Sequence, residues 1–182
     1  RDNVLNILNE LVPVYKDLTA YDDSKAYMND GGAKGKELAA KYVAAVEKFD
    51  AAYAKFNETL NKVNAEQSKK QIEKLKKDGK KGYAAAMEST LRLTELVDKL
   101  EKAPQNADKA AVEKELSEIE ALLKSINNDR GQVLADRYNS VVGDVRQVLA
   151  DPSDNNLNNM IEGFNGYIDT YNSTTPDQFD AK

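Results

Sequence analysis

The sequence contains no cysteine, histidine or tryptophan, and its 182 residues include only 9 glycines and 4 prolines. Without cysteine there is no disulfide framework, no thiol nucleophile and no Cys-based metal site. Without histidine the commonest general base and transition-metal ligand are missing, so a Ser-His-Asp triad cannot form. A Ser-Lys pair stays chemically open, although no spacing in the sequence indicates one. These absences predict a protein that is not an enzyme and binds no cofactor or metal.

Long hydrophobic runs are also missing. No apolar stretch approaches the roughly 20 residues that a membrane-spanning helix needs. The first residue is Arg rather than Met, so we expect the chain to be trimmed. A removed signal or anchor is consistent with this. Apolar residues make up 41% and charged residues 31% of the chain. This balance, with abundant Ala, Leu, Glu and Lys, favours a folded helical protein.

The strongest periodic signal lies between the glycines at 35 and 79. Apolar residues recur there at alternating steps of four and three, which is the seven-residue repeat of coiled coils and long-helix bundles. The repeat predicts one very long helix over about residues 34–77. Its members are Tyr42, Val46, Phe49, Tyr53, Phe56, Leu60 and Val63.

Similar spacing predicts the other helices. The first covers the N-terminal residues to about 28, with Pro13 expected to kink or split it. Others begin near Lys80, after Asn106 or Asp108, after a kink or break at 127–131, and after Ser153 or Asp154. No strand pattern occurs. The sequence therefore predicts an all-α, elongated antiparallel helical bundle, as one domain over residues 1–173 with a loose C-terminal tail at 174–182.

The stretch "NDGGAKGKE" (residues 29–37) has the superficial look of a phosphate-binding loop. That loop requires G-x-x-x-x-G-K-[ST] after a strand. Here Asp30 stands where the first Gly belongs, Glu37 stands where Ser or Thr belongs, and no strand precedes the stretch. We therefore interpret it as a turn at Gly31 and Gly32, with Asn29 or Asp30 beside the start of the long helix.

The same region carries a family resemblance. The segment "AKGKELAAKYVAAVEKFDAAYAKFNETL" (33–60), its lead-in "AYDDSKAYMND" (20–30) and the closing "FNGYIDTYN" (164–172) resemble the hallmarks of the YiiG-like envelope lipoproteins. Members of this bacterial family share a helical domain without an assigned function. They often carry His where Ala39 stands, and their lipid-bearing Cys is not in this chain. The resemblance implies a periplasmic or cell-surface location through a lipid anchor, and brings no catalytic residues.

A lysine cluster follows the long helix. Residues 68–81 hold seven lysines against Glu73 and Asp78, a local charge of +5 in a chain of net charge −5. The cluster suits an anionic partner such as lipid head groups or polysaccharide, or simply a solvated helix end that favours cations. Without Arg or interleaved aromatics, nucleic acid is not expected as a partner. The lysines are Lys69, Lys70, Lys74, Lys76, Lys77, Lys80 and Lys81.

Two further groups invite a functional reading. The acidic run at 113–120 contains an E-x-x-E pair, Glu115 and Glu118, but a di-iron bundle needs E-x-x-H, so we interpret the run as an exposed acidic face. The aromatic positions of the heptad can line a ligand groove; at this spacing they are more typical of core. If Phe49 is a core residue, Phe49→Ala lowers the free energy of unfolding of the protein by about 3–5 kcal/mol. The candidate groove residues are Tyr42, Phe49, Tyr53 and Phe56.

Two functions are consistent with these observations. The first is a non-catalytic envelope domain that binds another envelope component, protein or polysaccharide, or acts as a spacer. The second is a binder of a small ligand or cation in a cleft between helices. An enzyme of unrecognised type is a third and weaker alternative. The apolar face formed by a heptad repeat can be buried by another helix of the same chain or of a second chain. The sequence therefore leaves the oligomeric state open.

Overall fold

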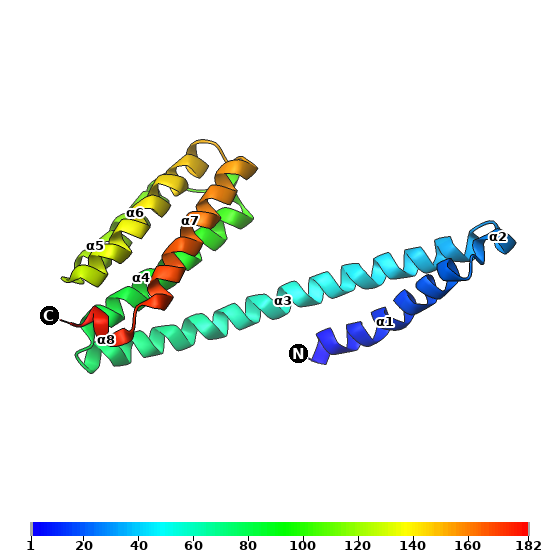
Figure 1. The fold of residues 1–182 in the computed structure, drawn as a ribbon, viewed down its shortest axis with the longest axis horizontal. Coiled ribbons are helices and arrows are strands. Elements are labelled where there is room, and N and C mark those ends of the chain that lie inside the picture. Colours follow the sequence, from blue (N-terminus) through cyan, green and yellow to red (C-terminus); the bar gives the residue numbers. More distant parts are fainter. Residues whose placement is uncertain (1, 182) are drawn as a thin grey trace. The chain divides into compact units, whose positions relative to one another are not determined.

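The computed structural model describes residues 2–181, and within them every regular element is a helix. The N-terminal part holds α1 (Asp2–Asp23), α2 (Tyr27–Asp30) and α3 (Ala33–Lys77); the remainder holds α4 (Lys81–Lys102), the 3-10 turn η1 (Pro104–Asn106), α5 (Lys109–Lys124), α6 (Asp129–Ala150), α7 (Asp154–Ser173) and α8 (Pro176–Phe179) (Figure 1). The predicted all-α class and the very long helix are confirmed. Pro13 lies inside α1 without dividing it.

By internal contacts the chain forms two compact units, residues 1–64 and residues 65–182, where the sequence predicted one domain. The helix α3 continues through the boundary at Asn64. The heptad repeat predicted one continuous helix correctly, but it contains no information on which part of that helix each neighbour contacts.

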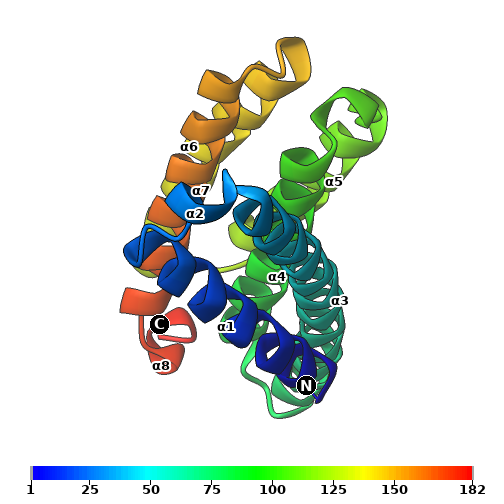
Figure 2. The ribbon, with the colours of Figure 1, turned by 90° about the vertical axis from the view of Figure 1, so that its right-hand side faces the viewer.

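The second unit is a four-helix bundle. Its helices α4, α5, α6 and α7 pack each on the next, and α4 also packs on α7, which closes the bundle. Figure 2 shows α4 beside α5 and α6 beside α7. The connections are short, so successive helices run antiparallel. Two caps fix them: Asp108 accepts the backbone N–H groups of Ala110 and Ala111 at 3.0 and 3.2 Å, and Asn128 begins α6 in the same way.

The core of this bundle follows the predicted spacing in α5 and α6 and departs from it in α7. Buried positions in α6 step regularly by three and four residues and end at Val148. In α7 the fully buried residues are Met160 and Tyr167, whereas Leu157 and Phe164 are half-buried against the core. The Tyr167 hydroxyl lies 3.2 Å from Ser89 Oγ and 3.1 Å from Thr90 Oγ1, which gives this buried phenol polar partners.

The C-terminal segment is not the loose tail that the sequence predicted. Residues 176–179 form the short helix α8, whose start is closed by a capping box between Thr175 and Gln178. Phe179 is 2% exposed and stacks on Tyr83 and Tyr171, with ring centroids 6.1 and 6.0 Å apart. One aromatic side chain fitting between α4 and α7 therefore orders the end of the chain.

Polar contacts hold the same segment at both sides. Asp180 accepts the N–H groups of Gly82 (2.7 Å) and Tyr83 (3.3 Å), so the tail caps the first turn of α4. The Asn128 amide donates to the carbonyl oxygens of Gln178, Phe179 and Ala181 at 3.2, 3.0 and 3.0 Å. The partners lie about 50 and 100 residues away in sequence, which is why local pattern could not show them.

Candidate functional site

The glycine-rich stretch is a helix start, as predicted, and not a phosphate cradle. Gly31 and Gly32 have φ of +64° and +85°, the left-handed conformation that glycine adopts freely. Asp30 accepts the N–H groups of Gly32 (2.9 Å) and Lys34 (3.3 Å) and the Tyr21 hydroxyl (2.6 Å). The Tyr21 hydrogen bond lowers the pKa of the Asp30 carboxyl. Two N–H groups at this helix start are therefore already bound by the Asp30 carboxylate.

Gly35, the glycine of the Gly-Lys pair, lies where the Tyr21 ring leaves no room for a side chain. A Cβ at this position would lie 2.6 Å from Tyr21 Cε1. We expect Gly35→Ala to lower the free energy of unfolding by about 1 kcal/mol, because overpacking against the movable Tyr21 ring outweighs the helix propensity gained. Thermal unfolding followed by circular dichroism measures this change. Tyr21→Ala in the same background should remove the clash; stabilisation by Gly35→Ala alone would contradict this packing role.

The seven lysines of the cluster have different surroundings in the structure. Lys76 pairs with Glu88 at 2.8 Å, and Lys80 pairs with Asp177 at 2.8 Å. Lys69, Lys70, Lys74 and Lys77 lie with Glu73 along one exposed face of α3. The hollow among these four lysines is lined by α3 alone, so it is a surface between side chains rather than a cleft. Lys81 is exposed at the first residue of α4.

The aromatic positions of the heptad are not the closed core that their spacing indicated. Tyr42 and Phe49 are half-buried, whereas Tyr53 is 48% and Phe56 37% exposed. Because Phe49 is half-buried, we expect Phe49→Ala to cost less than the roughly 3–5 kcal/mol of a fully buried aromatic. The candidate groove is found in part: Tyr53 and Phe56 line an apolar hollow of about 200 Å³ together with residues of α1. Tyr42 lies elsewhere, with its ring against that of Tyr15 at 6.1 Å.

The hollow belongs to a larger apolar surface of the α1–α3 hairpin. Between residues 3 and 64, only Leu38 is buried. Ten of the eleven strongly exposed large apolar side chains in residues 2–181 also lie in this unit. We define the hairpin face as those of them that lie on α1 and α3: Leu5, Val12, Tyr15, Val43, Tyr53, Phe56, Leu60 and Val63.

The members contributed by α1 and α3 meet along the hairpin. Leu5 lines the same hollow as Tyr53 and Phe56, and Tyr15 contacts Tyr42 further along. Leu5 and Val12 lie seven residues apart, on one edge of α1. The sequence did not identify Val12 as a candidate residue, because it lies beside the main apolar stripe of α1 and not within it. Its position beside that stripe was the available signal that α1 has a second apolar face.

A second candidate site is a cleft of about 600 Å³ between α4 and α5, next to η1. Its lining includes buried Leu96, Leu100 and Val112 together with charged Lys99 and Arg92. The volume falls within the roughly 300–1,000 Å³ range of small-molecule sites. An apolar floor with a charged rim suits an amphipathic ligand. The sequence reading did not find this cleft, because the lining comes from two helices and their connection.

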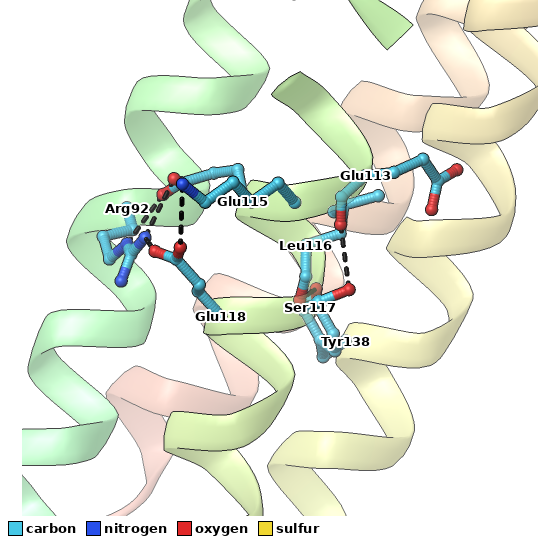
Figure 3. A network of polar contacts seen from close by, with 8 residues as sticks. Arg92, Glu113, Glu115, Leu116, Ser117, Glu118 and Tyr138 are labelled. Atoms are coloured by element: carbon cyan, nitrogen blue, oxygen red, sulfur yellow. Dashed lines mark hydrogen bonds and ion pairs between the residues drawn. The ribbon is translucent and has the colours of Figure 1, made fainter. Parts of the chain in front are cut away.

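Beside the cleft, Arg92 neutralises much of the acidic run (Figure 3). Its Nε donates to Glu115 Oε1 at 2.6 Å and its Nη2 to Glu115 Oε2 at 2.8 Å; it also pairs with Glu118. On the other side of α5, Glu113 pairs with Arg146. The buried Tyr138 hydroxyl donates to the Leu116 carbonyl at 2.6 Å (Figure 3). Desolvation raises the pKa of Tyr138.

These ion pairs predict acid sensitivity. Hydrogen bonds from Arg92 and Arg146 hold the pKa of Glu115 and of Glu113 below the ordinary value. A carboxyl with a depressed folded-state pKa contributes stability above its unfolded pKa and loses it as pH falls through the folded value. We therefore expect stability to decline below about pH 4.5, the unfolded range of Glu. Glu115→Gln should remove about 1 kcal/mol at pH 7, after screening, and flatten this decline.

Urea unfolding between pH 3 and 7 measures this acid dependence. Glu47→Gln is a suitable control, because Glu47 lies exposed on α3. An unchanged slope in Glu115→Gln, with the control also unchanged, would show that the Arg92–Glu115 pair contributes no pH-dependent stability.

Residues 2–181 contain no group of three or more acidic side chains arranged to hold a metal ion. Every helix described is too short or too polar to span a bilayer. The structure thus defines a class: a helical protein made of a four-helix bundle and a helical hairpin with an open apolar face.

The chain belongs to the family described as "Protein of unknown function (DUF3829)", whose model matches residues 2–150. This match spans α1 to α6, and therefore both the hairpin face and the α4–α5 cleft. Searches of curated proteins and of solved structures returned no match.

Proposed function

We propose that this protein is a non-catalytic binding module of the bacterial cell envelope, and that the hairpin face is where it binds another protein. The observation that carries the proposal is the concentration of exposed apolar side chains on one unit. Scattered exposed apolar residues are normal on a soluble surface, whereas a contiguous patch marks an interaction site. In residues 65–181 only Val133 is comparably exposed.

The geometry of the hairpin supports a protein partner. A helix buries its apolar stripe against another layer, and two helices alone form only one layer. The face runs along two helices and includes the rings of Tyr53 and Phe56, residue types that are enriched at protein interfaces.

The envelope location is proposed from the resemblance to the YiiG-like lipoproteins, whose lipid-bearing Cys would precede this chain. Fractionation of cells that carry the natural gene tests it. Recovery with the membrane or periplasmic fraction supports the proposal, and recovery with the cytosol contradicts it.

Photocrosslinking tests the binding function. A photoreactive phenylalanine replaces Val12 in one version of the protein and Val133 in another; the two valines are 46% and 45% exposed, each on a helix. We expect irradiation of cells to link position 12, and not position 133, to a protein that mass spectrometry then identifies. If position 12 gives no protein adduct, the proposed function is wrong.

The α4–α5 cleft supports a second candidate, a small-ligand binder. A thermal-shift screen of divalent cations, sugars, cell-wall fragments and anionic head groups tests it, since a ligand at a hundredfold excess over Kd adds about 2.7 kcal/mol. Ala111→Phe is the matched variant, because Ala111 lines the cleft and is exposed. A shift that this variant abolishes supports a ligand in the cleft. A flat screen, or a shift that survives the variant, contradicts one.

A further inference from the structure

We infer that the hairpin face binds the same face of a second copy of this chain, so that two α1–α3 hairpins form a symmetric four-helix arrangement. This inference rests on the proposed function and names the partner. Three features support it: the face has both projecting side chains and a hollow, its unit is almost neutral, and one side of the hairpin is large enough for a stable dimer interface.

The face is complementary to itself. Val4, Leu5, Tyr53 and Phe56 surround the hollow of about 200 Å³, whose lining is mainly apolar. Val12 projects from the same edge of α1 two turns away and is 46% exposed. In a two-fold interface each copy presents the same patch, so a ridge on one copy meets the hollow of the other. This is the knobs-into-holes arrangement that seven-residue repeats favour.

The charge of the unit favours self-association over an anionic partner. Residues 1–64 contain nine Lys and Arg and ten Asp and Glu, a net charge of −1, which leaves −4 for residues 65–182. Two nearly neutral surfaces approach with little repulsion, and low net charge promotes association. A lipid head group or nucleic acid would require a basic excess. The chain has that excess only at residues 68–81, outside the hairpin face.

The area of the face is sufficient. With 22 residues, α1 is about 33 Å long at 1.5 Å per residue, and two helices side by side are about 20 Å wide. One side of the hairpin therefore offers at most about 650 Å² per copy, or about 1,300 Å² for a pair. Stable specific interfaces bury roughly 1,200–2,000 Å² in total. Burial on this scale also supplies the second layer that the hairpin lacks.

Sedimentation velocity of the full chain between about 1 and 200 µM tests the inference, because interfaces of standard size bind with micromolar or tighter affinity. We expect a dimer in the wild type and in the control Val133→Lys. In Val12→Lys/Val43→Lys we expect at least tenfold weaker association, because four lysines are then placed in an apolar contact. Both positions are about half exposed and helical, so circular dichroism should show an unchanged helix content. Should the double variant nevertheless unfold, Leu60→Lys, 44% exposed, is expected to give the same weakening.

A wild type that stays monomeric at every concentration overturns the inference, as does a dimer that withstands these lysine substitutions. Neither result affects the proposed function if position 12 crosslinks to a different protein. A crosslink from position 12 to the same chain, combined with dimer loss in the lysine variants, supports both. The absence of any crosslink from position 12 overturns the proposed function itself.

Discussion

Replacing Phe179 by Ala is expected to lower the free energy of unfolding by about 3–5 kcal/mol, the cost typical of a fully buried aromatic. The ring is 2% exposed and stacks on Tyr83 and Tyr171. Its loss leaves a cavity between α4 and α7, and the segment that caps α4 through Asp180 loses its apolar anchor. Two-state urea unfolding followed by circular dichroism measures the change.

A graded control separates packing from a general effect of substitution. Phe179→Leu keeps most of the buried apolar volume and should cost only about 1 kcal/mol. A melting temperature that falls by less than about 2 °C in Phe179→Ala would mean that residues 174–181 are not docked in solution. The original prediction of a loose tail would then be restored.

The tail shows which parts of the fold the sequence could not supply. The segment "STTPDQFDAK" is polar and follows the last amphipathic helix, so local composition predicted a loose end. Its order depends on one Phe, one Asp and the amide of Asn128, whose partners are distant in sequence. By contrast, the very long helix and the Gly31–Gly32 turn depend on near neighbours, and both were predicted. The cap of α5 also depends on near neighbours, and the sequence narrowed it to Asn106 or Asp108.

The candidate site shows the same limit. The heptad spacing identified Tyr42, Phe49, Tyr53 and Phe56 correctly as members of one apolar stripe. The spacing shows that a helix has an apolar face. It does not show how much of that face other parts of the chain bury. Because α1 has 22 residues and α3 has 45, one helix cannot cover the apolar stripe of the other along its whole length. Leu60 and Val63 are 44% and 48% exposed among the described residues, and no residue pattern within α3 reveals this.

Glycine substitutions in α6 are expected to have opposite effects on stability according to what lies beside each glycine. A Cβ at Gly131 would lie 2.3 Å from the Ile126 carbonyl oxygen and 2.6 Å from Ile126 Cβ, whereas nothing lies within 4 Å of a Cβ at Gly143. Backbone oxygen cannot move aside as a side-chain tip can. Gly131→Ala should therefore cost about 3 kcal/mol, the upper part of the range for overpacking. Gly143→Ala should stabilise by about 0.5–1 kcal/mol through helix propensity.

The pair tests the α5–α6 connection within one helix and with one chemical change. Asn128 caps α6 through the N–H groups of Arg130 and Gly131, and its amide holds the tail. Movement of the backbone at Gly131 should therefore also loosen residues 176–181. Hydrogen exchange should show faster exchange at the Gly82 amide in Gly131→Ala and no change in Gly143→Ala. Equal effects of the two substitutions on stability would show that contact with Ile126 does not require a glycine at position 131.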